Sequence, residues 1–146
     1  MPFQAKAALV RETHAPVVVE TITVADPQRD EVTIKLGACG VCHSDLSAVN
    51  GTLPFPPPVV LGHEGAGTVV AVGEGVGDFA VGDTVLSSFV TMCGRCRWCA
   101  MGRPALCELS ARSMLTLPDG TLRTHDAQGQ PLKIFSGCGV MAEYAT

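Results

Sequence analysis

The sequence predicts one mainly β domain with short helices, arranged as a barrel or a sandwich. Its 146 residues include 16 glycines and 10 prolines, and valine-rich runs alternate with these turn-forming residues. Hydrophobic residues make up 47% of the chain and charged residues 16%, so there are enough apolar side chains to bury a core. The length is that of one ordinary domain.

The strands are predicted from local alternation and from the turns between them. Residues 33–36 alternate polar and apolar side chains, which is typical of a strand with one buried face. Runs of similar composition, bounded by glycine, proline or aspartate, follow along the chain. Strands are therefore predicted over residues 5–10, 16–24, 31–36, 68–72, 84–89 and 141–146.

Three further segments have other signals. Residues 44–49 predict a short helix, with Ser44 or Asp45 available as its N-cap. Residues 53–58 contain four prolines, which predict an extended surface loop. The pair at residues 119–120, Asp-Gly, predicts a hairpin turn.

Charge and hydropathy exclude several classes of partner. The chain has 10 Lys and Arg against 14 Asp and Glu, a formal net charge of −4, which disfavours binding to DNA or RNA. No apolar run approaches the ~18 residues of a membrane span. Residues 1–13 lack a signal-peptide pattern, so we expect a cytoplasmic protein without nucleic-acid or membrane partners.

Four of the seven cysteines form a compact pattern in residues 93–107. Their spacing, C-x2-C-x2-C-x7-C, allows four thiolates to surround one Zn²⁺ tetrahedrally, and an all-cysteine shell indicates a structural rather than a catalytic site. The alternative is four free or paired cysteines. An odd cysteine total argues against a disulfide framework. The predicted structural-zinc ligands are Cys93, Cys96, Cys99 and Cys107.

A second candidate site combines Cys42 with His63. A thiolate and an imidazole are good zinc ligands, and the nearby carboxylates of Asp45 and Glu64 could orient the imidazole or hold charge beside the metal. Twenty residues separate the pair. On spacing alone, a buried free cysteine and a core histidine are therefore the better interpretation.

Five motifs follow one another in a fixed order: residues 40–45, residues 62–67, the glycine-rich turn 73–76, residues 81–85 and the lobe 93–107. In this order they resemble the zinc-dependent alcohol dehydrogenases of the medium-chain dehydrogenase/reductase superfamily, from about residue 5 to residue 146. The resemblance implies that residues 1–146 form the GroES-like β-barrel catalytic domain, with residues 93–107 as its zinc-binding lobe.

The resemblance also implies roles for individual residues. Cys42 and His63 match two ligands of the catalytic zinc, and Glu64 matches the glutamate that can approach the metal. Asp45 matches the carboxylate behind the zinc histidine. Ser44 matches the hydroxyl that takes the proton of the substrate.

Other matches concern the cofactor and the substrate. His43 matches the basic position that meets the cofactor pyrophosphate, and Phe89 and Leu53 match walls of the substrate pocket. Ser47 departs from the family, which often has a histidine there that completes the proton relay. Phe89 and the prolines of residues 54–58 indicate an apolar pocket, consistent with aryl or longer alkyl alcohols.

Parts of the family pattern are not found in this sequence. The third cysteine of the catalytic zinc and the Rossmann cofactor domain are expected beyond these residues. Cys138 is out of register for that ligand, and Cys39 is expected to be a small buried residue. Residues 75–80 and 137–142 match G-x-G-x-x-A, but neither follows a strand and opens a helix, so both are predicted to be turns.

The leading hypothesis is the catalytic portion of an alcohol dehydrogenase that passes hydride to NAD(P) in a longer, homo-oligomeric enzyme. We expect the isolated chain to be inactive and monomeric, with structural zinc bound and the catalytic zinc weak or absent. The alternative is a non-catalytic zinc-binding structural or interaction module. The zinc-free quinone-reductase branch of the superfamily is disfavoured because both zinc motifs are present.

Overall fold

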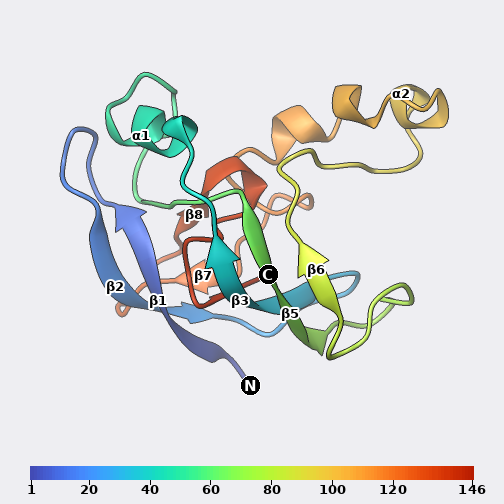
Figure 1. Cartoon of the computed structure of the whole chain (residues 1–146), viewed down its shortest axis with the longest axis horizontal. Helices are drawn as coiled ribbons and strands as arrows, with labels where there is room; N and C mark the ends of the chain where they lie inside the picture. The colour runs from blue at the N-terminus through green and yellow to red at the C-terminus, as the bar shows by residue number, and fades with distance from the viewer.

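The fold consists of two β-sheets that form a nearly closed barrel (Figure 1). A computed structural model describes residues 1–146, with Ala111 described by its backbone alone. One sheet has the strand order β7-β2-β1-β4-β8 and the other β6-β5-β3-β9. The strands are β1 (Phe3–Val10), β2 (Val18–Val24), β3 (Val32–Cys39), β4 (Val59–Val60), β5 (Gly65–Val72), β6 (Thr84–Leu86), β7 (Thr124–His125), β8 (Lys133–Ile134) and β9 (Tyr144–Ala145).

The long antiparallel pair β1–β2 shows how the sequence specifies the sheet. Along β1 the apolar Ala5 and Ala7 are buried, whereas Gln4 and Lys6 at the alternate positions are exposed. This period of two places one face of the strand on the core. The register is fixed accordingly, because a shift of one residue would turn the apolar side chains toward water.

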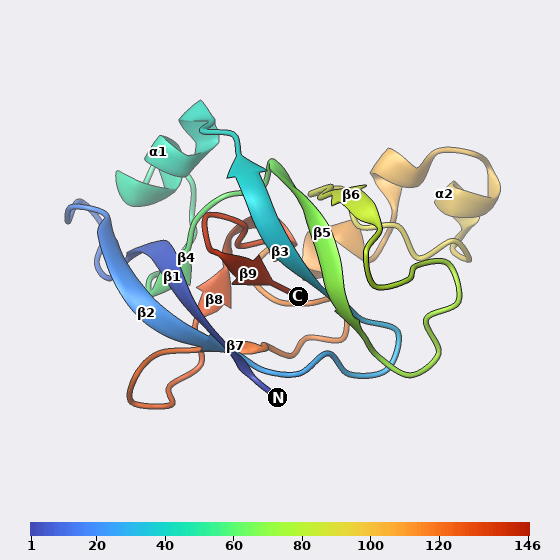
Figure 2. The same cartoon turned by 60° about the horizontal axis from the view of Figure 1, so that its bottom comes forward.

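The two sheets are joined where β1 meets the segment before β9. The N–H of Ala8 donates to the carbonyl of Met141 at 2.8 Å, and the N–H of Glu143 donates to the carbonyl of Lys6 at 2.9 Å. Figure 2 shows β9 beside β3, with which it pairs. The predicted β-barrel is thereby confirmed.

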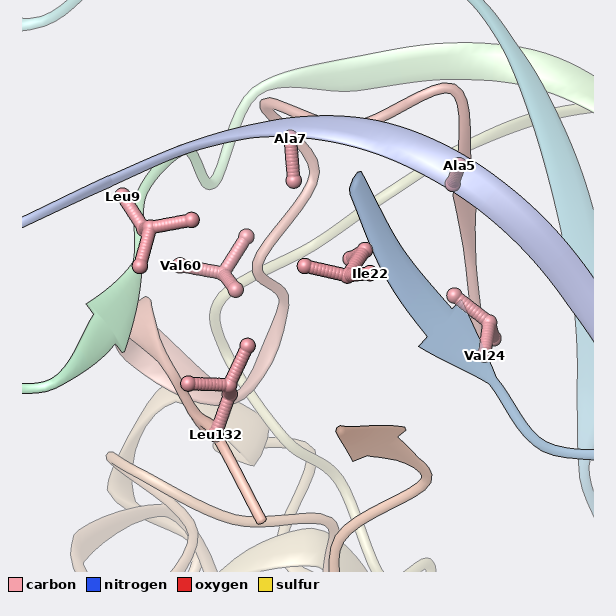
Figure 3. Packing of buried hydrophobic residues seen from close by; sticks show 7 residues of the cluster. All are labelled: Ala5, Ala7, Leu9, Ile22, Val24, Val60 and Leu132. Atoms are coloured by element: carbon pink, nitrogen blue, oxygen red, sulfur yellow. The ribbon is translucent and has the colours of Figure 1, made fainter. Parts of the chain in front are cut away.

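The first core cluster lies inside the barrel, between β1, β2 and β4. Figure 3 shows its side chains pointing toward one another. Leu9, Val24 and Leu132 are fully buried, and the aromatic rings of Phe3 and Tyr144 stack at its edge with centroids 4.8 Å apart. The cluster comprises Ala5, Ala7, Leu9, Ile22, Val24, Val60 and Leu132.

The helices are short and lie outside the barrel. α1 (His43–Val49) follows β3, and α2 (Arg97–Ala100) belongs to the cysteine lobe together with the 3₁₀ turns η1 (Pro104–Leu106) and η2 (Ser110–Arg112). A third 3₁₀ turn, η3 (Phe135–Gly137), follows β8. α1 and the lobe lie at two separate corners of the molecule (Figures 1 and 2).

Several sequence predictions are confirmed and others are corrected. The N-cap of α1 is Cys42, not Ser44 or Asp45, because the helix already begins at His43. The strand predicted over residues 84–89 ends at Leu86, and Ser87 then bonds the backbone of Gly65, at the start of β5, through both its N–H and its hydroxyl. The turn at residues 119–120 is present, but it joins irregular segments rather than hairpin strands.

The remaining differences concern very short elements. Strands β4, β7 and β8 have two residues each and were not predicted, since so short a run has no periodicity to detect. The two G-x-G-x-x-A segments are loops, one between β5 and β6 and the other leading into β9. Among the described residues, no helix has the length and apolar character needed to cross a membrane.

Candidate functional site

The first half of the site is built by the turn from β3 into α1. Cys42 caps the helix in an extended conformation, and its N–H donates to Oδ2 of Asp45 at 3.0 Å. This reciprocal cap satisfies a helix N–H that otherwise has no partner in the first turn. The Cys42 thiol lies 3.5 Å from the hydroxyl oxygen of Ser44. The cap therefore holds a thiol and a hydroxyl side by side at the helix N-terminus.

Asp45 connects this turn to the second half of the site. Its side chain is 4% exposed, and its other oxygen, Oδ1, accepts a hydrogen bond from the N–H of Gly62 at 3.0 Å. The same oxygen lies 3.6 Å from Nδ1 of His63. One buried carboxylate thus links the segment containing Cys42 to the segment containing His63.

His63 is held just before β5 by its backbone and by aromatic rings. The hydroxyl of Ser87 accepts a hydrogen bond from the N–H of Gly65 at 2.7 Å and donates to the carbonyl of His63 at 3.3 Å. The imidazole lies between Phe135 and Phe89, edge to face, with centroids 5.2 Å and 5.8 Å away. These contacts restrict the imidazole to one orientation.

The orientation directs the two ring nitrogens to different groups. Nδ1 is buried and faces Asp45 without a hydrogen bond, whereas Nε2 lies 3.8 Å from Oε1 of Glu64. One donor atom from each of Cys42, His63 and Glu64 lies within 4.8 Å of the others. A thiol, an imidazole and a carboxylate at this spacing fit the three protein ligands of a catalytic zinc ion. In a metal-binding histidine the ring nitrogen away from the metal usually faces a carboxylate, and Nδ1 of His63 lies 3.6 Å from Oδ1 of Asp45.

The other residues predicted for this site lie around the same turn. His43 is exposed at the start of α1, and its Nδ1 lies 3.3 Å from the hydroxyl oxygen of Ser47 one helical turn later. Ser47 stands where the family often has the histidine that completes the proton relay. Its side chain is buried, and its hydroxyl faces His43.

A cavity of about 340 Å³ opens beside His63 and Glu64, and the ring of Phe89 forms part of its wall. Phe89 is 53% exposed. Leu53, the other predicted wall residue, packs instead against the second core cluster around Phe55 and Phe135. The structure thus brings Phe89 to the candidate site and places Leu53 with the core. The complete lining is His63, Glu64, Gly65, Ala66, Leu86, Ser87, Ser88 and Phe89.

The four-cysteine lobe forms the second cluster of metal-binding side chains. One sulfur from each of Cys93, Cys96, Cys99 and Cys107 lies within 4.8 Å of the others, and the sulfurs of Cys96 and Cys107 are 4.0 Å apart. A tetrahedral zinc with bonds of about 2.3 Å requires sulfurs about 3.8 Å apart. The thiols are therefore already placed for one ion.

Backbone N–H groups and arginines surround these thiols. The N–H of Cys96 donates to the sulfur of Cys93 at 3.3 Å, and the N–H of Leu109 donates to the sulfur of Cys107 at 3.4 Å. Hydrogen bonds from the backbone of Cys99 and Glu108 lower the pKa of the Cys96 thiol to about 6. Arg95 and Arg112 line a cavity of about 230 Å³ next to the thiols. These donors favour the thiolate, the form that binds metal, at Cys96, whereas burial raises the pKa of the Cys99 thiol to about 11.

The two remaining cysteines lie outside both clusters. Cys138 is buried in the third core cluster with Val69 and Val140, and burial raises the pKa of its thiol to about 11. Cys39 ends β3 and is half buried, and burial also raises the pKa of its thiol. Both thiols are thus protonated and packed as small apolar groups.

Sequence reasoning missed two residues that hold His63. Phe135 lies in a segment without any motif, and only its packing against Phe55 and His63 reveals its role. Ser87 was predicted to be part of a strand. A polar residue at the end of a predicted strand, next to a metal-ligand motif, is the available signal for such a backbone clamp.

Comparisons with known proteins support the same family. Residues 28–146 match the alcohol dehydrogenase GroES-like domain family. The chain is 40% identical over 146 residues to an S-(hydroxymethyl)glutathione dehydrogenase of Candida maltosa, covering 98% of this chain and 38% of that protein. It is 43% identical over 142 residues to an alcohol dehydrogenase class-3 of Drosophila melanogaster, covering 95% and 37%. The chain thus spans less than two-fifths of the length of these relatives.

Solved structures agree in fold. An alcohol dehydrogenase zinc-binding domain protein from Burkholderia ambifaria superposes with a TM-score of 0.91 at 38% identity, over 99% of this chain and 40% of that one. A benzyl alcohol dehydrogenase from Acinetobacter calcoaceticus gives 0.81 at 32% identity, over 98% and 38%. With the family match across most of its length, the chain belongs to the GroES-like domain of the zinc-dependent medium-chain alcohol dehydrogenases.

Proposed function

We propose that the chain is the catalytic-domain portion of a zinc-dependent alcohol dehydrogenase, which oxidises an alcohol to an aldehyde or ketone and transfers hydride to NAD(P) in the full-length enzyme. The observation that carries this proposal is the convergence of Cys42, His63 and Glu64 within 4.8 Å, with the Ser44 hydroxyl next to the Cys42 thiol. Zinc bound by Cys42 and His63, with Glu64 beside it, would supply a Lewis acid that lowers the pKa of an alcohol hydroxyl.

The residues of the chain orient the substrate and move its proton. The Ser44 hydroxyl, 3.5 Å from the Cys42 sulfur, relays the proton of a bound alcohol: it accepts that proton and releases its own toward solvent. Asp45 keeps the His63 ring in register by facing its Nδ1. Phe89 keeps water from one side of the cavity. His43, exposed at the start of α1, meets the pyrophosphate of the cofactor.

The cysteine lobe has a separate, structural role in this proposal. Its four thiols complete a tetrahedron, which leaves no position for substrate. Structural zinc contributes roughly 10–16 kcal/mol of apparent binding free energy in small peptides, comparable to the stability of a whole domain. We therefore assign the lobe the tightly held ion. The first site, with an exposed carboxylate as third donor, holds zinc weakly in the isolated chain.

The substrate class follows from the cavity beside His63. Phe89 contributes an aromatic wall, and Gly65, Ala66 and Leu86 contribute small or apolar surface. Such a lining favours aryl or longer alkyl alcohols over strongly polar ones. The similarity to a benzyl alcohol dehydrogenase is consistent with this assignment.

The test uses a longer parent protein that includes this chain and a cofactor domain. Cys42→Ala is expected to reduce benzyl alcohol oxidation by several orders of magnitude, because it removes a ligand of the catalytic metal. Cys39→Ala, three residues away and outside the ligand set, is the matched control and is expected to retain activity. Unchanged oxidation in the Cys42→Ala parent would overturn the proposal.

A second measurement separates this proposal from a non-catalytic zinc module. We expect the 146-residue chain to bind NAD more weakly than micromolar and to oxidise no alcohol at a useful rate. The parent is expected to bind NAD and to oxidise alcohols. Positioning the nicotinamide about 3–3.5 Å from the reacting carbon accounts for much of the acceleration. If the parent binds zinc only at the lobe and does not oxidise alcohols, the result would favour the non-catalytic zinc module. Micromolar NAD binding by the 146 residues would overturn the domain assignment.

A further inference from the structure

Gly40 lies between the end of β3 and Cys42, and the side chain of Glu64 lies directly over it. The N–H of Gly40 donates to the backbone carbonyl of Glu64 at 2.8 Å. A Cβ added at Gly40 would collide with Oε2 of Glu64 and would lie 3.1 Å from its Cβ and 3.4 Å from its Cδ. The carboxylate of Glu64 therefore occupies the space that any other residue at position 40 would fill.

The backbone at Gly40 does not itself require glycine. Its φ angle lies outside the left-handed region, in contrast to Gly62, whose φ is 91°. The atoms nearest to an added Cβ all belong to Glu64: rotation of its side chain relieves the contact with the carboxylate, and a shift of a few tenths of an ångström relieves the contact with its Cβ. The Glu64 side chain is 50% exposed, so it can swing into solvent at little cost in stability. Such a swing would remove its carboxylate from Cys42 and His63.

We propose that Gly40 is a positioning residue for the metal site: the absence of a side chain there lets the Glu64 carboxylate lie beside Cys42 and His63. The proposal rests on the proposed function, in which Glu64 contributes a metal ligand. It assigns to Gly40 an effect on metal affinity that is exerted through Glu64 and not through the fold.

The first experiment does not depend on metal. The sample is the 146-residue chain with zinc bound in the cysteine lobe and no metal added for the Cys42 site. Its NMR spectra are expected to show that the Gly40 α-protons lie close to the Glu64 side chain. In Gly40→Ala, the Glu64 γ-protons are expected to lose their contacts with residue 40, whereas its β-protons, fixed by the backbone, keep theirs. Unchanged contacts in the variant, with neighbouring backbone shifting instead, would overturn the proposal.

The second experiment measures Co²⁺ binding at the Cys42 site by absorption, with zinc retained in the lobe. Gly40→Ala and Glu64→Ala are each expected to weaken Co²⁺ binding by about 10-fold, as expected for loss of a supporting group. The double variant is expected to match Glu64→Ala alone, because both changes remove the same carboxylate. Gly37→Ala on β3 is the control, since its Cβ meets only the Ala66 carbonyl at 3.8 Å.

The possible outcomes distinguish a failure of the Gly40 proposal from a failure of the proposed metal site. Additive weakening in the double variant would overturn the route through Glu64, as would unaltered Co²⁺ binding in Gly40→Ala. Retention of Co²⁺ binding at this site in Cys42→Ala would contradict the proposed metal set instead. In that case the NMR contacts would still decide whether Gly40 positions Glu64.

Discussion

The carboxylate of Asp45 accepts a hydrogen bond from the N–H of Gly62 at 3.0 Å, across 17 residues of sequence. Asp45 belongs to the first turn of α1, and Gly62 precedes His63 before β5. Because the other oxygen of the same carboxylate holds the N–H of Cys42, this bond fixes the distance between the two segments that carry the metal-binding side chains.

Asp45→Ala is expected to weaken zinc binding at the Cys42 site by 10–100-fold, the usual effect of losing a group that orients a ligand. It also leaves the buried N–H of Gly62 without its acceptor, which costs about 1–3 kcal/mol of unfolding free energy. Metal titration and urea unfolding measure the two effects. Asp45→Asn retains one acceptor oxygen and is expected to recover part of the stability. Equal zinc affinity in all three proteins would contradict the prediction.

Cys96→Ala is expected to lower the zinc content by one ion per chain and to disorder the lobe. Three thiols leave the tetrahedron incomplete, and the loop geometry around α2 then has no central ion to hold it. Elemental analysis of freshly purified protein measures the content, and amide NMR measures the order. Cys39→Ala is the control, with zinc content expected to be unchanged. A Cys96→Ala protein that keeps its zinc and an ordered lobe would refute the assignment.

Leu132→Ala is expected to lower the unfolding free energy by about 2–5 kcal/mol, because its fully buried side chain fills the centre of the first core cluster. Leu86→Ala serves as the matched control. Leu86 is 81% exposed, so the same change there is expected to alter stability by less than about 0.5 kcal/mol. Denaturant unfolding compares the two, and similar losses would show that the core is misidentified.

Asp126→Asn is expected to destabilise the chain at neutral pH and to lose this effect in acid. The N–H of Gln130 donates to the Asp126 carboxylate, and with the N–H of Gln128 and the guanidinium of Arg11 it holds the pKa of Asp126 below its ordinary value. The ionised form thus stabilises the fold above the unfolded pKa of about 3.9, and this stabilisation disappears as the pH falls through the lower folded value.

Unfolding curves at pH 3 to 7 therefore test Asp126→Asn. The gap between wild type and variant is expected to be constant above about pH 5 and to narrow below about pH 4. The control substitution is Asp78→Asn at an exposed position, where a change in unfolding free energy of less than about 0.5 kcal/mol is expected. A gap that widens in acid would reverse the assigned direction of the pKa shift.

The longer elements of the fold were predictable because their patterns are local. Exposed and buried residues alternate in β1 from Gln4 to Ala7, and the spacing of four cysteines within fifteen residues restricts where the lobe must fold. The two-residue strands β4 and β8 were not predictable. They form a parallel pair only because the chain between residues 60 and 133 returns to the same edge, a long-range event that leaves no periodicity.

The sequence predicted the metal-binding residues of the site, but it did not predict the residues that hold them in place. Cys42, His63 and Glu64 were identified through motif order, and the structure brings them together. Phe135 beside the imidazole could not be found, because a buried phenylalanine near the C-terminal end of a chain has many possible partners. Leu53 was predicted as a pocket wall from the family alone, and it packs, partly buried, against the cluster that contains Phe55 and Phe135.

The junction between the two sheets affects the order in which the chain folds and binds metal. The segment before His63 is held by residues from both ends of the chain: Leu61 donates to the carbonyl of Ala8, and Val140 donates to the carbonyl of Gly62. The four lobe thiols, in contrast, close over a short loop with little entropy loss. Distant pairings of this kind form slowly. We therefore expect a newly made chain to capture metal at the lobe early and to become competent at the Cys42 centre only in its last folding step.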